Sequence, residues 1–378
     1  MALSPRTTAA RQLLTALTSS PSSSADWSNT LSSLGADWLC HQRLASMTWW
    51  MFQQANLSDD LQRDLRRAYY AAAGDAELHQ RELAHVLRQL NDQQIQVVVF
   101  KGAALAYSVY PDPACRTMGD IDLWMAGEDV ERARQALREM GYESFGKLDR
   151  PPTLMALFQG EIGLRHRDSE YGLVELHWGV FPGEWLRRMA TIDIDAVRRR
   201  VVLARLVDET AHMLAPEDAI IQSALHTAIN HQMSMSPLRA LVDIALLARH
   251  TPIDWTVIVQ RARTWRVATA VWLVLSLAVD LAGLNEAAEA ARELQPSALR
   301  RRLIGRLANA GSLVMMRDLS ASQWRYVFLL LLIDRGRDAL CLIFRALWPE
   351  REWLIARYGR YTFTTRLRHL FDAARGKI

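Results

Sequence analysis

The pattern of hydrophobic and polar positions changes at Gln94. From about residue 26 to residue 90, apolar residues recur at helical spacing, most clearly in the run Leu83, Val86, Leu87 and Leu90. Residues 95–100 instead form a nearly unbroken β-branched and apolar run, which is typical of a central strand. Ahead of both, residues 1–18 predict a short amphipathic helix and residues 19–24 a polar linker.

Strand and helix patterns alternate in the segment that follows. Residues 102–107 and 128–140 have helical patterns, and the second of these begins with acidic residues, as helix capping favours. Residues 120–125 predict a second strand, and residues 161–167 and 173–178 predict the two arms of a hairpin. The segment therefore predicts a small mixed sheet with helices packed against it.

Beyond about residue 190 we expect no further strand pair, and helical patterns dominate, over residues 216–231, 238–250, 254–284, 285–310 and 323–347. The predicted fold class is α+β, with a small mixed β-sheet core between an N-terminal and a larger C-terminal helical region. We place the boundaries of these three parts at residues 1–90, 91–190 and 191–378.

The second predicted strand carries two acids on one face. Asp120 and Asp122 are two positions apart, so their side chains project from the same side, while Ile121 and Leu123 point into a core. Two carboxylates about 6 Å apart repel by about 3 kcal/mol at an effective dielectric near 20. The pair therefore favours a cation beside it, and Mg²⁺ suits it because this ion binds through one or two carboxylates, water and substrate phosphates.

Other residues complete a candidate phosphoryl-transfer site. Glu175 and His177 share one face of the second hairpin arm, and Glu175 could be a third metal ligand that also helps to remove a proton from the attacking hydroxyl. Lys101-Gly102 would place a cation and a close backbone turn at the start of a helix, where phosphate oxygens bind. Arg116 could clamp phosphate oxygens with its guanidinium. Each member also has a structural interpretation: Arg116 as a salt-bridge partner, Glu175 as an exposed strand acid, and His177 as a hydrogen-bonded structural side chain.

The motifs occur in a characteristic order: Phe100-Lys101-Gly102-Ala103-Ala104-Leu105, Tyr110-Pro111, Arg116, Asp120-Ile121-Asp122-Leu123, Gly141-Tyr142 and Val174-Glu175-Leu176-His177-Trp178. Similar positions follow in the helical part, at Leu225-His226, Arg239 with Asp243, Ile253-Asp254-Trp255, and from Leu347-Trp348-Pro349 to Tyr358-Gly359. In this order the sequence resembles the nucleotidyltransferase superfamily with a polymerase-β-like core, in particular its bacterial branch of uncharacterised nucleotidyltransferases.

The resemblance implies roles for the matching residues. Asp120, Asp122 and Glu175 would be catalytic metal ligands, and Lys101, Gly102 and Arg116 would bind the nucleotide. Lys101-Gly102 stands where the wider superfamily has Gly-Ser, so the lysine would take over the phosphate contact of the serine. His177, His226, Arg239 and Asp243 are candidates for the acceptor side, although a buried polar network that braces helices is the favoured interpretation of the last three.

The implied activity is the transfer of a nucleoside monophosphate from an NTP, expected to be ATP, to a hydroxyl or phosphate acceptor, with Mg²⁺ or Mn²⁺ and release of pyrophosphate. The acceptor would be a small molecule, a peptide or a protein, since members of this branch resemble enzymes found beside peptide-modification and polysaccharide gene sets. One alternative is a non-catalytic module that binds a peptide or partner on a degenerate core. A third interpretation, an RNA-tailing enzyme, lacks stacking aromatics along a basic strip, so a nucleic-acid partner is the weaker expectation.

Composition changes this picture little. The 378 residues are 50% hydrophobic, the formal charge is +4, and the arginines that gather toward the C-terminus are expected to form a solvated helical face. The cysteines, Cys40, Cys115 and Cys341, are spaced neither as a zinc site nor as a disulfide framework. No apolar stretch reaches membrane-spanning length, so we expect a cytoplasmic protein with no membrane partner.

Overall fold

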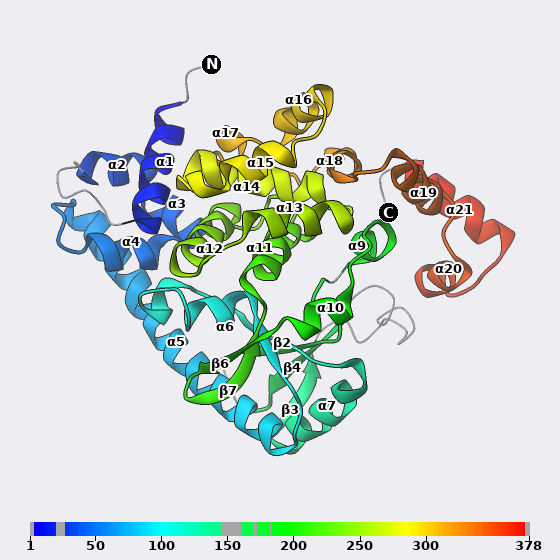
Figure 1. Cartoon of the computed structure of the whole chain (residues 1–378), viewed down its shortest axis with the longest axis horizontal. Helices are drawn as coiled ribbons and strands as arrows, with labels where there is room; N and C mark the ends of the chain where they lie inside the picture. Colours follow the sequence, from blue (N-terminus) through cyan, green and yellow to red (C-terminus); the bar gives the residue numbers. More distant parts are fainter. Residues whose placement is uncertain (1–3, 20–26, 146–159, 169–171, 182, 375–378) are drawn as a thin grey trace.

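The computed structural model describes residues 4–19, 27–145, 160–168, 172–181 and 183–374. A mixed seven-stranded sheet with the strand order β3-β4-β5-β2-β1-β7-β6 lies beneath a large helical body (Figure 1). Its strands are β1 (Val98–Phe100), β2 (Asp120–Trp124), β3 (Tyr142–Phe145), β4 (Glu161–His166), β5 (Leu173–His177), β6 (Val202–Leu206) and β7 (Glu209–Met213). The expected α+β class is therefore confirmed.

The sheet is parallel at two of its junctions. β2 pairs in parallel with β5 and β1 pairs in parallel with β7, whereas the other neighbouring strands are antiparallel. Because side chains alternate along a strand, Val99, Ile121 and Val174 enter one core, against helices α5 (Asp59–Asp92) and α7 (Val130–Glu139). The opposite face of the sheet is left to face the helical body.

The helical body combines both ends of the chain. The N-terminal helices are α1 (Pro5–Thr18), α2 (Trp27–Leu34), α3 (Ala36–His41) and α4 (Ala45–Phe52). The later helices are α6 (Lys101–Ala106), α9 (Glu184–Met189), α10 (Ile194–Arg199), α11 (Pro216–Leu225), α12 (Pro237–His250), α13 (Trp255–Thr264), α14 (Ala268–Ala282), α15 (Ala288–Glu293), α16 (Ala298–Leu307), α17 (Ala310–Val314) and α18 (Trp324–Leu332). α1 packs on α12 and α14, and Leu13 shares one hydrophobic core with Leu241 and Val274.

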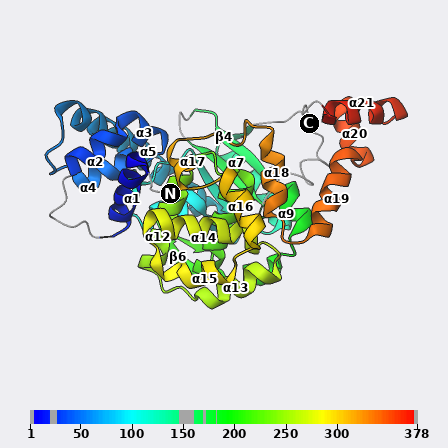
Figure 2. The ribbon, with the colours of Figure 1, turned by 90° about the horizontal axis from the view of Figure 1, so that it is seen from above.

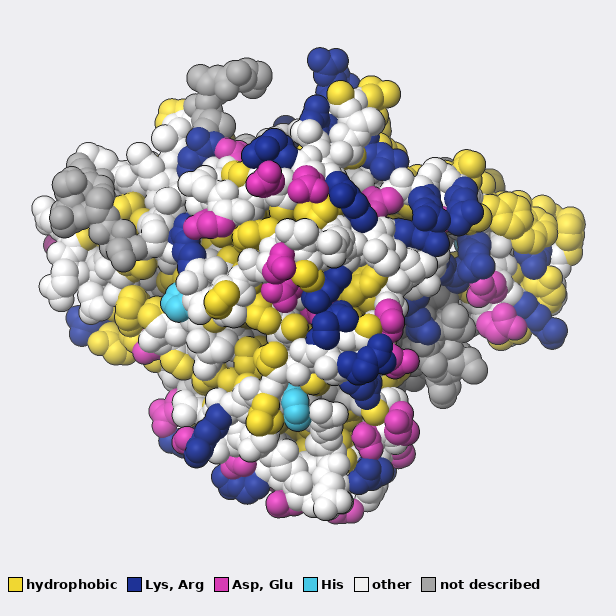
Figure 3. Space-filling view, viewed as in Figure 1, with side chains coloured by type: hydrophobic (Ala, Val, Ile, Leu, Met, Phe, Trp, Pro, Cys, Tyr) yellow, Lys and Arg dark blue, Asp and Glu magenta, His cyan; other side chains and the backbone are white. Residues whose placement is uncertain are grey.

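The last three helices extend away from this body as an arm (Figures 1 and 2). They are α19 (Gly336–Leu347), α20 (Arg351–Tyr358) and α21 (Phe363–Ala374). The side chains of Arg337 and Arg368 are each 71% exposed, and large apolar side chains such as Phe344 and Phe363 are exposed beside them. In Figure 3 arginines and hydrophobic side chains lie together on this arm. No helix of the described residues is long and apolar enough to cross a membrane.

The expectation of no strand pair after residue 190 is wrong, because β6 and β7 form a hairpin that continues the sheet beyond β1. Its two-residue turn is Val207-Asp208, and both residues have positive φ, 47° and 67°. Hairpin turns of this kind favour Asn-Gly or Asp-Gly, and Val-Asp offers no such signal. β6 is an edge strand, and polar residues are usual on the exposed face of such a strand. Its exposed side chains include Val202 and Leu203, so the usual alternation of apolar and polar residues is missing.

The long helices predicted over residues 254–284, 285–310 and 323–347 are each broken in the structure. The first break separates α13 from α14 at Arg266, whose φ is 61°. Left-handed residues commonly end helices, but the usual residue there is glycine, so an arginine hides the break from sequence inspection. Residues 1–3 of the first predicted helix and residues 20–24 of the predicted linker lie outside the described residues.

Candidate active site

The pairing of β2 with β5 brings two of the predicted carboxylates together. In this parallel pair Asp122 lies opposite Glu175, and Trp124 lies opposite His177. Side chains at paired positions lie on the same side of the sheet, which for these residues is the side that faces the helical body. Asp120 precedes Asp122 by two positions on β2 and shares this face.

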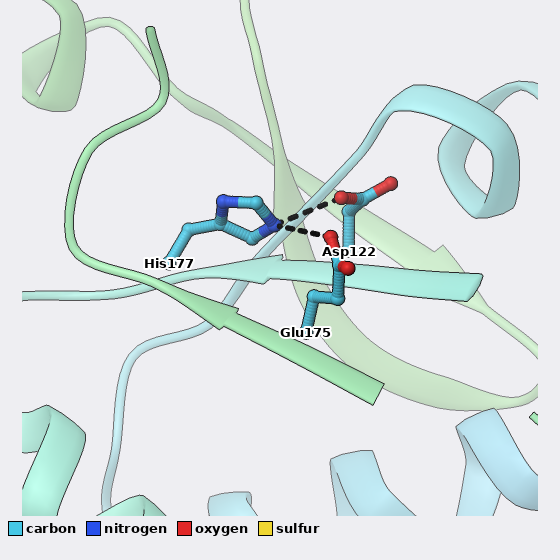
Figure 4. A group of neighbouring side chains, drawn as sticks. All are labelled: Asp122, Glu175 and His177. Atoms are coloured by element: carbon cyan, nitrogen blue, oxygen red, sulfur yellow. Dashed lines mark hydrogen bonds and ion pairs between the residues drawn. The ribbon is translucent and has the colours of Figure 1, made fainter. Parts of the chain in front are cut away.

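Asp122, Glu175 and His177 form a compact group (Figure 4). His177 Nε2 lies 2.8 Å from Asp122 Oδ1 and 3.4 Å from Glu175 Oε2. One ligand atom from each of the three residues lies within 4.8 Å of the others, a spacing that a metal ion could bridge. Asp120 is outside this group, and burial together with the charge of Asp122 raises the pKa of its carboxyl.

Lys101 begins α6 and neutralises part of this acidic group. Its Nζ lies 2.5 Å from Asp122 Oδ1. Burial by itself would raise the pKa of Asp122, but Lys101 and His177 hold it well below its usual value, so Asp122 is ionised. Lys101 has φ 54°, a left-handed conformation that costs a non-glycine residue about 1 kcal/mol or more. Such strain is often found at functional sites.

Gly102 follows Lys101 at a point where the chain is closely packed. A Cβ on Gly102 would lie 3.3 Å from Met118 Cβ and 3.5 Å from Arg116 Nη1. A side chain at this position would therefore press on the segment that leads from Arg116 into β2, and with it on the position of Asp120.

Arg116 is engaged with Asp243 of α12. Its Nε and Nη2 donate to the two carboxylate oxygens of Asp243 at 2.7 and 2.9 Å, and its Nη1 donates to the carbonyl of Thr117. Tyr110 Oη donates to the same carboxylate at 2.7 Å, and Arg239 Nη1 donates to the same Thr117 carbonyl at 2.9 Å. This network braces α12 against the chain that enters β2. The phosphate contact expected for Arg116 remains a prediction, and it would require a change of partner.

His226 is the first residue of a π-helical turn (His226–Asn230) that follows α11, and His231 comes directly after this turn. Their Nε2 atoms are 2.7 Å apart, so one ring donates to the other. Burial, followed by the charge of Lys101, lowers the pKa of His226 well below its usual value and that of His231 to about 4. Both rings are therefore neutral at pH 7. Single π-helical turns occur frequently at functional sites.

A cavity of about 920 Å³ connects these groups. Nine of the ten residues singled out from the sequence line it, namely Lys101, Gly102, Arg116, Asp120, Asp122, Glu175, His226, Arg239 and Asp243. The tenth, His177, is fully buried behind Asp122. Residues of the sheet and residues of the helices that follow it thus converge on one space, although Asp122 and Asp243 are far apart in the chain.

Sequence reasoning missed several residues of this wall. Glu161 on β4 lies opposite His177 across the β4–β5 pair, and its Oε2 is 3.3 Å from His177 Nδ1. Pairing the two arms of the predicted hairpin would have found it. Arg43 and His231 also line the cavity, but nothing in their sequence surroundings marks them.

Comparison with known proteins supports one assignment. Residues 26–283 match the model of a family described as uncharacterised nucleotidyltransferase. Among solved structures, the lincosamide antibiotic adenylyltransferase LnuA, with lincomycin bound, is 15% identical and has a TM-score of 0.30 over 45% of this chain and 97% of LnuA. An antigenic nucleotidyltransferase-like protein from Paracoccidioides brasiliensis is also 15% identical, with a TM-score of 0.38 over 57% of this chain and 92% of that one. These TM-scores support no residue-by-residue correspondence. No curated protein matches the chain.

Proposed function

Because the chain belongs to the uncharacterised nucleotidyltransferase family, we propose that it transfers a nucleoside monophosphate from an NTP to an acceptor hydroxyl or phosphate. The observation that carries this proposal is the meeting of Asp122 and Glu175, from paired parallel strands, at the wall of a large cavity. We further propose ATP as the nucleotide, a place in the superfamily with a polymerase-β-like core, and the three-part organisation with boundaries near residues 90 and 190.

The donor set fits a hard divalent cation. Asp122 and Glu175 offer carboxylate oxygens at a spacing that an ion could bridge, and carboxylates suit Mg²⁺ and Mn²⁺. These two residues would hold the ion, with Asp120, on the same face of β2, as the proposed third ligand. His177 positions Asp122 through its hydrogen bond, as residues behind a metal ligand commonly do. When bound, the metal would neutralise charge on the phosphates as the bond to pyrophosphate breaks.

The chain's own residues would carry the other parts of the reaction. The acceptor oxygen attacks the α-phosphorus of the NTP, the bond from this phosphorus to the bridging oxygen breaks, and pyrophosphate leaves with the electron pair. Glu175, which is partly exposed to the cavity, would accept the proton of the acceptor hydroxyl. Lys101 would exchange its contact with Asp122 for a contact with a phosphate oxygen. It would thereby replace the serine of the Gly-Ser pair that the wider superfamily has at this position.

Titration calorimetry with α,β-methylene-ATP, which cannot release pyrophosphate, tests this proposal. The wild type should bind it with Mg²⁺ and lose most of this affinity without the metal. Asp122→Asn and Glu175→Gln should each weaken binding by at least about tenfold. Glu143→Gln, a change at a carboxylate that is 60% exposed on β3, is the matched control. Equal affinities of the wild type and Asp122→Asn, with and without Mg²⁺, would refute the metal-dependent site.

One observation favours the alternative of a binding module without catalysis. Lys101 pairs with Asp122 and occupies its Oδ1, so a cation of the chain itself already stands beside this carboxylate, as expected of a core that has lost its reaction. Incubation with labelled NTPs and a pool of small molecules, peptides and RNAs separates the two functions. Label that stays on a defined product, identified by mass spectrometry, excludes the binding module. Nucleotide binding with no labelled product from any acceptor favours it.

A further inference from the structure

The cavity wall carries charges of both signs. Asp120, Asp122 and Glu175 line it together with Lys101, which pairs with Asp122. Arg239 of α12 and Arg43, which lies between α3 and α4, line it as well. Within the described residues, neither of these two arginines forms an ion pair with a carboxylate.

Arg239 lies in a neighbourhood with more positive than negative charge. It shares the carbonyl of Thr117 with Arg116, so the two guanidiniums are close to each other. Asp243, the carboxylate of this network, already accepts both donors of the Arg116 fork and the hydroxyl of Tyr110. Burial, followed by the charge of Arg116, lowers the pKa of Arg239 to about 9. An anion beside Arg239 would relieve this excess of positive charge.

The histidine pair lines the same cavity. The charge of Lys101 lowers the pKa of both rings, and the charges of Arg239 and Arg43 lower that of His231, so the pair lies close to cations of the wall. His226 Nδ1 is buried and has no hydrogen-bond partner in the described structure, so this uncharged pair still offers a polar atom to a ligand.

We propose that Arg43 and Arg239 bind an anionic group, a carboxylate or phosphate, of the acceptor, so that the acceptor's hydroxyl is held in the same cavity as the acidic group. This inference rests on the proposed nucleotidyl transfer. A volume of about 920 Å³ is near the upper end for small-molecule sites, and it leaves room for a second ligand beside a nucleotide. The acceptors selected in this way are small acidic molecules or peptides that end in a carboxylate.

The same arginines could instead bind the triphosphate of the NTP. An experiment with two ligands distinguishes an anionic group of the acceptor from this triphosphate. Inorganic phosphate is titrated by calorimetry into protein saturated with Mg²⁺ and α,β-methylene-ATP. We expect the wild type to bind phosphate while the analogue stays bound. Arg239→Gln and Arg43→Gln should each weaken phosphate binding by at least about tenfold and leave the affinity for the analogue within about twofold. Arg292→Gln, at an exposed arginine of α15, is the matched control.

Arg43 is exposed, so its variant should fold even if Arg239→Gln does not, and Arg239→Lys keeps the charge as a further check. Competition between phosphate and the analogue, or loss of analogue affinity in Arg239→Gln, would show that the arginines bind the triphosphate and would overturn the acceptor assignment. The assignment would also be overturned if the wild type binds the analogue but not phosphate. The same holds if Arg239→Gln and Arg43→Gln bind phosphate as the wild type does, or if they weaken phosphate binding no more than Arg292→Gln does. If the wild type does not bind the analogue at all, the proposed function itself fails.

Discussion

Removal of the Asp243 carboxylate should destabilise the protein strongly. Asp243 and Arg116 are 4% and 6% exposed, and they are joined by two hydrogen bonds in a fork. Asp243→Ala would leave the Arg116 guanidinium buried without a counter-charge, beside the second guanidinium of Arg239. The hydroxyl of Tyr110 would lose its acceptor as well.

The expected loss follows from this geometry. Breaking a buried ion pair by removing one partner typically costs about 3–5 kcal/mol of unfolding free energy, because an uncompensated charge stays buried. Tyr110→Phe removes one hydrogen bond to a charged acceptor and should cost about 1.5–3 kcal/mol. The double variant Arg116→Met/Asp243→Leu removes both charges and should recover part of the loss of Asp243→Ala, since apolar residues of similar size often replace buried pairs well.

Urea denaturation followed by far-ultraviolet circular dichroism measures these free energies. Glu77→Ala is the control, because the Glu77 side chain is 63% exposed within α5 and its ion pair with Arg81 lies at the surface, so it should change the stability by less than about 1 kcal/mol. A loss below about 1 kcal/mol in Asp243→Ala would refute the reasoning, since it would mean that water or a rearranged partner compensates Arg116. A double variant that is less stable than Asp243→Ala would contradict the argument from desolvation.

Two further predictions concern charges at the cavity. Lys101→Met removes the cation that lies 2.5 Å from Asp122. In calorimetry without nucleotide, the affinity for Mg²⁺ should therefore rise by at least about tenfold, while the affinity for α,β-methylene-ATP falls. An unchanged Mg²⁺ affinity would contradict the ion-pair argument. His231 stays neutral in the folded state down to a pKa of about 4, whereas the unfolded chain binds its proton near pH 6.5. Stability should therefore fall by up to about 3 kcal/mol as the pH drops from 6.5 to 4, and His231→Gln should remove this part of the slope; an identical pH profile in His231→Gln would disprove it.

The sequence predicted the parts of the fold that local patterns encode. The unbroken apolar run before Lys101 and the alternation around Asp122 correctly indicated β1 and β2, and the hairpin of β4 and β5 was placed within a residue or two. Alternation also put Glu175 and His177 on one face. It could not show that β5 pairs in parallel with β2, because that register depends on how the sheet is assembled and not on either strand alone.

The parts that were missed depend on exceptions or on contacts across long stretches of chain. The β6–β7 turn places Val207 and Asp208 at positive φ, and Arg266, just after the end of α13, has the same kind of backbone, so the usual glycine and asparagine signals are missing. The partnership of Arg116 with Asp243 joins residues 127 positions apart. No local pattern encodes such a pair. The interpretation of Asp243 as part of a buried polar network did predict that it has a buried polar partner, but not which one.

Backbone strain gathers at the wall of the cavity. Arg43, Lys101 and Ser236 all line it, and their φ angles are 55°, 54° and 46°. For residues with a Cβ, each such conformation costs about 1–2 kcal/mol, and it persists only where the surroundings fix it. At Lys101 the constraints are visible: buried Phe100 precedes it, closely packed Gly102 follows it, and Asp122 holds its Nζ.

This strain has a consequence for how a ligand would be bound. A side chain that its surroundings already hold loses little freedom when a ligand arrives, so less of the interaction energy is spent on ordering it. Asp122 holds Lys101 Nζ, so Lys101 meets this condition beside the carboxylates. The left-handed conformation of Arg43 instead follows from its place just after α3, where Leu44 N donates to the Leu39 carbonyl, an arrangement that commonly ends helices. The strain at Lys101 is therefore the part that favours a preorganised anion position.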